Sequence, residues 1–208
     1  MSRTPQEWDA KYAAAAGGPG STLWTAGPNP GLAAVLEETI ADEPAGGCID
    51  VAAGEGRHAV WLAARGWRVQ AGDFSRIGLE RAEQAAAAAG VAVDTVCADV
   101  TEWEPAAPVD LVLCAYLHIP SAVIRPLLVR LGGWVAPRGR LVLLGHDIAN
   151  LDGGVGGPQD PDVLWDSDLL RTTATEAGLD VKRAEQVRRA VAGEPRPALD
   201  VLQVARRP

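Results

Sequence analysis

The stretch Cys48–Ser75 reads CIDVAAGEGRHAVWLAARGWRVQAGDFS. An apolar run that contains Asp50 leads into a turn of small residues at 52–56, and a helical pattern continues as far as Gly66. A second apolar run then ends at Asp73. The order of strand, glycine turn, helix, strand and acidic residue predicts one half of a nucleotide-binding α/β sheet.

Each part of this pattern has a physical use at a nucleotide site. Glycines let the backbone approach a ligand closely, and the start of a helix offers unpaired N–H groups. An acid about 20 residues beyond the turn is placed to hydrogen-bond ribose hydroxyls. Asp73 stands at that distance.

The segment resembles motif I and the acidic residue that follows it in the class I S-adenosylmethionine (SAM) dependent methyltransferases. Their usual turn is an acid, a spacer and then GxGxG. Asp50 stands at the acid, and Gly54 and Gly56 stand at the second and third glycines. Ala52 replaces the first glycine, and its methyl group is tolerable where a ligand passes if φ stays negative.

Two other functions remain open. Residues 54–59 also satisfy the pattern G-x-G-x-x-A, and Asp73 suits the ribose of NAD, so an NAD(P)-dependent oxidoreductase is the alternative enzyme. Asp50 argues against it, because a carboxylate repels a pyrophosphate and suits the ammonium of a methionine moiety. A protein of methyltransferase fold that binds SAM without turnover is the third possibility.

The rest of the chain extends the same architecture. Further strands are expected at 91–100, 110–116 and 140–145, with helices at 76–90, 121–132 and 166–177. Residues 181–189 and 199–205 are expected to form an antiparallel hairpin. We expect an α/β fold with a doubly wound, seven-stranded, mostly parallel sheet, the Rossmann-like methyltransferase fold. Residues 1–208 are expected to form a single domain, with a helical cover over 1–45 and the sheet core over 46–208.

The resemblance implies a set of residues that bind SAM or its product S-adenosylhomocysteine (SAH). Asp50 would orient the methionine amine, Asp73 would bind the ribose and Asp99 would accept from the adenine amino group. The expected cofactor-binding residues are Trp24, Asp50, Ala52, Gly54, Gly56, Arg57, Asp73, Phe74, Asp99, Val100, Ala115 and Tyr116.

The sequence is further similar to the small-molecule branch that includes the tellurite-resistance and thiopurine methyltransferases. That similarity lies in Trp8 and Tyr12, in the segment from Leu23 to Pro30, in GEGRHAVWLAARGW, and in LVLCAYLH with GGWVAPRGRLVLLGHD. It implies in-line transfer of a methyl group to a small nucleophile, for example a thiol, a chalcogen oxyanion or another xenobiotic. Trp8 and Tyr12 are expected near the substrate, where an aromatic face attracts a sulfonium cation.

Two of the three histidines are candidates for acid–base chemistry. His118 follows the fourth expected strand and His146 follows the fifth, so either is a candidate base or substrate contact. Asp147 is a candidate to orient His146 or to contact substrate. His58 lies early in the first core helix and is expected to be structural or to lie near the cofactor.

Composition limits the partners. A net charge of -8 argues against a nucleic-acid surface, and there is no apolar stretch of about 20 residues that would span a bilayer. Cys48, Cys97 and Cys114 lie within expected strands without a C-x-x-C pair, so we expect buried free thiols, no metal and a cytoplasmic location. The expected partner is a small molecule, and the sequence leaves the oligomeric state open.

Overall fold

The computed structural model describes residues 4–15, 22–23, 27–41 and 44–208. In these residues seven strands form a mixed sheet in the order β3-β2-β1-β4-β5-β7-β6. The strands are β1 (Gly47–Val51), β2 (Arg68–Asp73), β3 (Asp94–Cys97), β4 (Val109–Ala115), β5 (Val135–His146), β6 (Asp180–Arg189) and β7 (Ala198–Arg206). β1 and β3 pair parallel to β2, whereas β7 runs antiparallel to both β5 and β6. The predicted fold class and its C-terminal hairpin are therefore confirmed.

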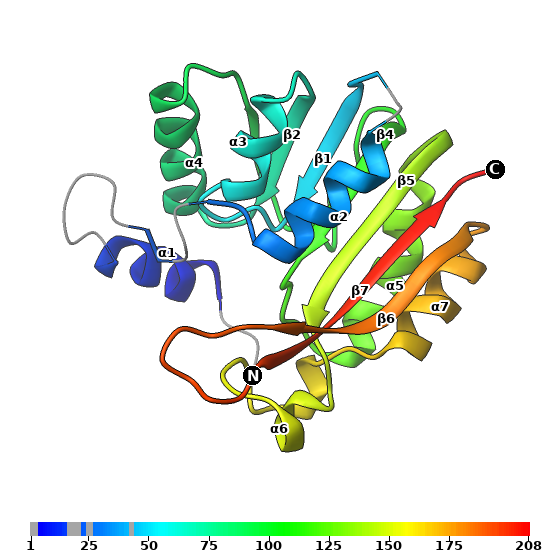
Figure 1. Ribbon diagram of the computed structural model, residues 1–208. Coiled ribbons are helices and arrows are strands. Elements are labelled where there is room, and N and C mark those ends of the chain that lie inside the picture. Colours follow the sequence, from blue (N-terminus) through cyan, green and yellow to red (C-terminus); the bar gives the residue numbers. More distant parts are fainter. Residues whose placement is uncertain (1–3, 16–21, 24–26, 42–43) are drawn as a thin grey trace. The chain divides into compact units, whose positions relative to one another are not determined.

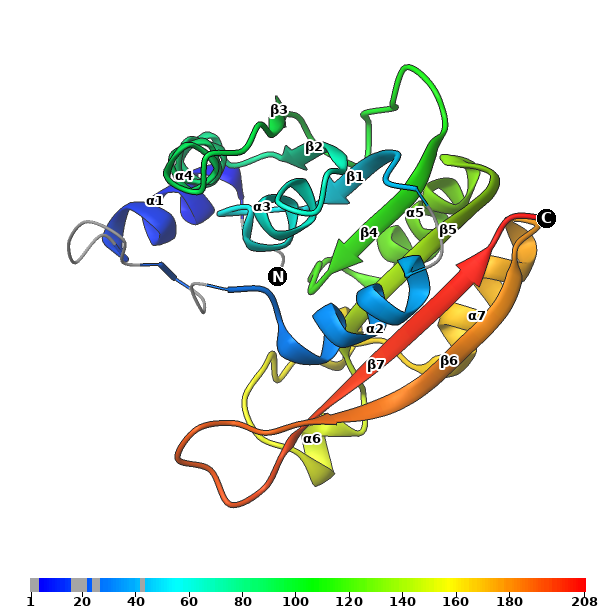
Figure 2. The ribbon, with the colours of Figure 1, turned by 45° about the horizontal axis from the view of Figure 1, so that its top comes forward.

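The chain divides into two compact units, Arg3–Val109 and Asp110–Pro208, called here the N-terminal and C-terminal units. In the N-terminal unit, α3 (Arg57–Ala63) and α4 (Arg76–Ala88) pack on β2. Figure 2 shows these helices beside β1 and β2, with α1 (Pro5–Ala14) lying against α4. Ser75 begins α4 by accepting the Gly78 N–H at 3.0 Å, as an N-cap serine does.

The second helix of this unit, α2 (Pro30–Ile40), has a capped start. Asn29 accepts the Leu32 N–H at 3.0 Å, and Pro30 takes the first helical position, where its missing N–H costs nothing. Its buried face contains Leu32, Val35 and Leu36. An amphipathic helix with one apolar face is the structure that this spacing favours.

The C-terminal unit is built around β7. All eight residues from Ala198 to Ala205 are buried, because β7 lies between β5 and β6. α5 (Ser121–Gly133) contacts β5, and α7 (Ser167–Glu176) contacts both strands of the hairpin. Figure 1 shows the two helices on one face of these strands. The shorter helices α6 (Asn150–Gly153) and η1 (Pro161–Val163) lie between β5 and α7 in the sequence.

Three expectations about strands and thiols are wrong. β3 spans only Asp94–Cys97 instead of 91–100, because it is an edge strand that pairs only with the last residues of β2. β5 begins at Val135 rather than Arg140. Cys97 is exposed, whereas Cys48 and Cys114 are buried as expected. An edge strand leaves side chains without a neighbouring strand to cover them.

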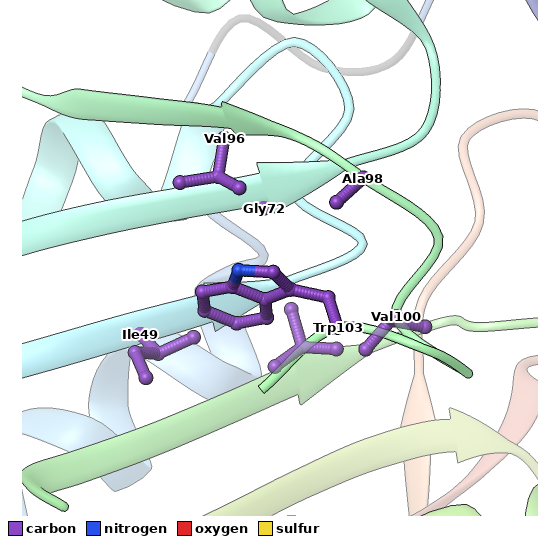
Figure 3. Close-up of a pocket in the computed structure, with 7 residues that line it drawn as sticks. Ile49, Gly72, Val96, Ala98, Val100 and Trp103 are labelled. Atoms are coloured by element: carbon purple, nitrogen blue, oxygen red, sulfur yellow. The ribbon is translucent and has the colours of Figure 1, made fainter. Parts of the chain in front are cut away.

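Trp103 covers one face of the N-terminal strands. It follows β3, and its indole lies in a small apolar pocket over Ile49, Gly72 and Val96 (Figure 3). Val100 lines the same pocket. Because successive side chains of a strand point to opposite faces, Ile49 points to the face opposite Asp50. Trp103 therefore packs against the strands on this face.

Candidate functional site

The glycine turn between β1 and α3 adopts left-handed backbone conformations. Gly54 has φ 54° and Gly56 has φ 72°. A Cβ at Gly54 would collide with the hydroxyl of Tyr12, and one at Gly56 would lie 2.6 Å from Cβ of Ala82. Both glycines are therefore required by conformation and by close packing.

Ala52 departs from the conformation expected of it. Its φ is 55°, in the left-handed region that favours glycine, so the condition of a negative φ, under which its methyl group would be tolerable, is not met. A left-handed L-residue costs about 1–2 kcal/mol. The turn therefore keeps the geometry of a three-glycine loop although the first glycine is absent.

Asp50 presents a buried carboxylate beside this turn. Its relative exposure is 1%, and its Oδ2 atom has no hydrogen-bond partner among the described residues. Burial raises the pKa of Asp50 to about 7, although the Ala59 N–H and the nearby Arg57 oppose that rise and Asp73 adds to it. An unsatisfied buried carboxylate is costly unless a ligand pairs with it. A ligand ammonium group fits this requirement.

Asp73, the last residue of β2, links the turn to α4. Its Oδ2 accepts the Gly54 N–H and its Oδ1 accepts the Ser75 N–H, each at 2.8 Å. Burial raises the pKa of Asp73 in spite of these two hydrogen bonds. A carboxylate offers about four lone-pair directions, so each oxygen can still accept a further hydrogen bond from a ligand hydroxyl.

Helix α1 is attached over the same turn. The buried ring of Tyr12 lies against Gly54 and Gly78, and Trp8 lies 5.6 Å from Tyr12 between ring centroids. Asp9 accepts the Ser75 hydroxyl at 2.5 Å and the Ile77 N–H at 3.2 Å. Sequence reasoning missed Asp9, because its partners are 66 and 68 residues away.

Glu55 is a second residue that the sequence did not single out. It is buried, forms an ion pair with Arg81 at 2.7 Å and accepts the Leu23 N–H at 2.8 Å. Glu55 therefore holds the segment before α2 beside the glycine turn. The sequence feature that could have identified Glu55 is its position as a charged residue between the two glycines of a turn. Trp24, the expected neighbour of the methionine moiety, lies outside the described residues.

His58 has a structural position in α3. Burial and the charge of Arg57 lower the pKa of His58 to about 3, so the imidazole is neutral. Its Nε2 accepts the Asn29 N–H at 3.3 Å. This bond ties the start of α2 to α3, in agreement with the structural alternative expected for His58.

The residues expected around an adenine lie after β2 and β3. Asp99 is exposed, and its Oδ1 accepts both the N–H and the hydroxyl of Thr101, at 2.8 and 2.7 Å. Phe74 is half-buried, and its carbonyl accepts the thiol of Cys97 at 3.7 Å. Val100 lines the pocket under Trp103. Adenine contacts of Phe74, Asp99 and Val100 stay predictions.

The remaining candidates lie in the C-terminal unit, around Asp200. Tyr116 follows Ala115 at the end of β4, has φ 61° and donates its hydroxyl to Asp200 at 2.8 Å. His146 ends β5, and its Nδ1 lies 3.0 Å from Asp200 Oδ1. Arg189 of β6 donates to Asp200 Oδ2 at 2.7 Å. Asp200 and Arg189 were not predicted.

The other two candidates of this unit have different neighbours. The ring of His118 stacks on His146, with centroids 5.3 Å apart and planes 11° apart. Asp147 is buried and accepts the Ala149 N–H at 2.8 Å. The carboxylate that pairs with His146 is thus Asp200, and the expectation that Asp147 orients this ring is wrong.

In residues 4–15, 22–23, 27–41 and 44–208, no three His, Cys, Asp or Glu side chains gather to hold a metal ion. None of the helices in these ranges is long and apolar enough to cross a membrane.

Comparison with known proteins finds a family match over part of the chain. Residues 48–139 match the family described as "Methyltransferase domain". No curated protein matches the chain by sequence.

Solved structures show the same fold at low sequence identity. A structure concerned with conversion of a disulfide bond into a thioacetal group during echinomycin biosynthesis has a TM-score of 0.73 at 21% identity, covering 99% of this chain and 92% of that chain. The magnesium protoporphyrin IX methyltransferase ChlM from Synechocystis PCC 6803, with bound SAM, has a TM-score of 0.68 at 19% identity. The match covers 98% of this chain and 90% of that chain. TehB from Haemophilus influenzae has a TM-score of 0.69 at 10% identity, covering 84% of this chain and 62% of that chain.

Proposed function

We propose that this chain is a SAM-dependent methyltransferase that moves the methyl group of SAM to a small-molecule nucleophile by in-line displacement. The observation that carries the proposal is the unpaired, buried Oδ2 of Asp50 beside a glycine turn. This atom needs a cationic or hydrogen-bonding ligand, and the ammonium of a methionine moiety supplies both.

The N-terminal unit supplies the residues that would hold the cofactor. Asp50 binds the ammonium, and Asp73 accepts from ribose hydroxyls with the lone pairs left free by Gly54 and Ser75. Asp99 accepts from the adenine amino group. Arg57, half-buried at the start of α3, pairs with the methionine carboxylate. The contacts expected of Trp24, Ala115 and Tyr116 stay predictions.

When bound, SAM supplies a methyl group on a sulfonium, which is already an activated leaving group. The protein's own task is to orient the acceptor and to exclude water, and orientation alone contributes on the order of 7–11 kcal/mol. A thiol or chalcogen acceptor needs little help in losing a proton. A hydroxyl or amine acceptor needs a general base.

A small acceptor suits the way α1 is attached. Tyr12 lies on Gly54, and Asp9 is bonded to Ser75 beside the turn, so α1 covers part of the region where the cofactor would bind. ChlM, a fold neighbour, acts on magnesium protoporphyrin IX, which supports a small-molecule acceptor. The substrate contacts of Trp8, Tyr12 and Asp147, and the cytoplasmic location, stay predictions.

Transfer from radiolabelled SAM to a panel of phenols, amines, thiols, selenite and tellurite tests the function. We expect label in at least one acceptor and a loss of at least tenfold in transfer with Asp50→Asn. The control is Glu80→Gln, which also removes one carboxylate charge but at an exposed position of α4. It should leave transfer unchanged. SAM binding without transfer to any acceptor would instead favour a protein that binds SAM without turnover.

A further inference from the structure

Two carboxylates of the N-terminal unit stand in the same local arrangement. Asp73 ends β2 and Asp99 follows β3, and each is followed two residues later by a hydroxyl residue, Ser75 or Thr101. In both turns the Oδ1 atom of the carboxylate accepts the backbone N–H of that hydroxyl residue at 2.8 Å. The two turns can therefore be compared directly.

The hydroxyl groups of the two turns have different acceptors. Thr101 donates its hydroxyl at 2.7 Å to the same Asp99 Oδ1 atom that accepts its N–H. Ser75 instead donates its hydroxyl to Asp9 of α1, at 2.5 Å. Ser75 is 0% exposed, so its hydroxyl needs an acceptor within the protein. Asp9 supplies that acceptor and takes the place that Asp73 would hold in a turn like that of Asp99.

The packing of α1 fixes the position of Asp9. Asp9 and Tyr12 are three residues apart, so they lie on the same face of this helix. The buried ring of Tyr12 lies against Gly54 and Gly78, and Asp9 also accepts the Ile77 N–H at 3.2 Å. Helix α1 therefore brings its carboxylate to the start of α4.

The contact with Asp9 keeps the Ser75 hydroxyl away from Asp73. The Asp73 carboxylate already receives the Gly54 N–H on Oδ2 and the Ser75 N–H on Oδ1. A carboxylate has about four acceptor positions, so a hydroxyl placed like that of Thr101 would take one of the few that remain. A ligand diol, such as that of a ribose, needs those positions.

We propose that Asp9 is a positioning residue for ribose recognition: by accepting the Ser75 hydroxyl, it leaves Asp73 open to a vicinal diol. This inference rests on the proposed function, in which Asp73 binds the ribose of SAM, and it adds a residue of α1 to that contact. Coupling between two contacts is reciprocal. A diol bound to Asp73 therefore stabilises the attachment of α1 through Ser75.

The charges at this serine agree with the proposal. Burial raises the pKa of Asp73 and the nearby Asp9 adds to the rise, whereas the N–H groups of Ser75, Gly54 and Phe74 oppose it. Two carboxylates that meet at one serine repel each other. Hydroxyl groups donated by a ligand to Asp73 stabilise its ionised form and so offset part of this repulsion.

A cycle that removes the ligand hydroxyls and the Asp9 carboxylate in turn tests the inference. SAH and its 2′,3′-dideoxy analogue are titrated calorimetrically into the full-length protein at pH 8. We expect loss of the hydroxyls to weaken binding to the wild type about tenfold or more. In Asp9→Ala we expect the same loss to weaken binding only about threefold or less. If Asp9→Ala weakened both ligands equally, α1 would be a general cover and the inference would be overturned.

Two further variants separate the hydroxyl from the helix. The double variant Asp9→Ala, Ser75→Ala has no hydroxyl to occupy Asp73, so we expect it to discriminate between the two ligands as the wild type does. Asp9→Asn keeps an acceptor oxygen for Ser75 and should retain most of the discrimination. The matched control is Glu7→Gln, an exposed change on the same helix, which should bind both ligands as the wild type does. Discrimination as low in the double variant as in Asp9→Ala would contradict the role of the hydroxyl.

A measurement without ligand reports on the same contact. Carbon-13 NMR of labelled aspartate side chains follows the titration of Asp73, whose signal is the one missing in Asp73→Asn. We expect a lower pKa of Asp73 in Asp9→Asn than in the wild type, because one neighbouring negative charge is gone while Asp50 is unchanged. An unmoved pKa would overturn the inference.

The two measurements also distinguish this inference from the proposed function. Absence of SAH binding, with the pKa shift of Asp73 present, would contradict the proposed function. Binding of SAH with equal losses for both ligands in Asp9→Ala would contradict only the role of Asp9.

Discussion

The residue with the least expected conformation in the glycine turn is Ala52. At φ 55° its methyl group is strained, and glycine would remove a cost of about 1–2 kcal/mol. The greater freedom of glycine in the unfolded chain offsets about 0.5–1 kcal/mol of that gain. We expect Ala52→Gly to raise the free energy of unfolding by up to about 1 kcal/mol, measured by urea denaturation.

The neighbouring alanine is the matched control. Ala53 is absent from the left-handed residues of the described chain, and its N–H donates to the Gly72 carbonyl at 3.0 Å. Ala53→Gly should therefore lower stability by about 0.5–1 kcal/mol. Equal losses in the two variants would contradict the strain assigned to Ala52.

The second residue that governs the site is Asp50, whose pKa is raised to about 7. An ammonium ligand favours the ionised carboxylate, so below this pH binding must first remove a proton. We expect the affinity for SAH to rise between about pH 5 and 7, by up to tenfold per pH unit, and then to level off. Calorimetry in buffers of different ionisation enthalpy should show proton release.

The variant Asp50→Asn separates the contribution of Asp50 to the pH dependence of SAH binding from that of Asp73, whose pKa is also raised by burial. The amide cannot ionise, so the variant should bind SAH more weakly and with little dependence on pH. If the wild-type affinity were flat over the same range, Asp50 would not contact the ligand's ammonium.

At the scale of elements, the attachment of α1 depends on Asp9. Its carboxylate binds the Ser75 hydroxyl and the Ile77 N–H at the start of α4. An acid at a helix start contributes about 0.5–2 kcal/mol through capping and the helix dipole. We expect Asp9→Ala to lower amide-exchange protection across α1 and at the first turn of α4, with smaller changes in the C-terminal unit.

Glu7→Gln is the control for this variant. Glu7 lies on the same helix, but in the exposed capping box with Thr4. Its loss should weaken only the first turn of α1. Protection of α4 that falls equally in both variants would contradict the role assigned to Asp9.

The elements could be predicted where their signals are local. Asn29-Pro30 and Ser75 mark helix starts through their own side chains, and the turn residues Gly193-Glu194-Pro195 between the last two apolar runs predict the hairpin. The length of β3 could not be predicted, because it depends on the position of the strand in the sheet. β3 lies at the edge and pairs with β2 alone.

In the candidate site, too, residues with local sequence signals could be predicted and residues that depend on distant partners could not. Asp50, Gly54 and Asp73 belong to one contiguous motif, whereas Asp200 lies 54 residues beyond His146 and has no motif of its own. A signal was nevertheless present, because ALDVLQVA places an acid in a mainly apolar strand. A buried acid requires partners, although sequence alone does not name them.

At the scale of the whole molecule, the two units divide the predicted functions. The N-terminal unit contains the glycine turn and Asp50, whose Oδ2 has no hydrogen-bond partner among the described residues, and the C-terminal unit contains the His146–Asp200 pair. That residues 1–208 form a single domain stays a prediction. The central claim is that the N-terminal unit binds an adenosyl ligand with an ammonium group rather than a dinucleotide.

Calorimetric titration of the full chain with SAH and with NADH tests that claim most directly. We expect SAH to bind with a Kd in the micromolar range, on the order of −8 kcal/mol, and NADH to give no binding heat. Binding of NADH with no binding of SAH would contradict it.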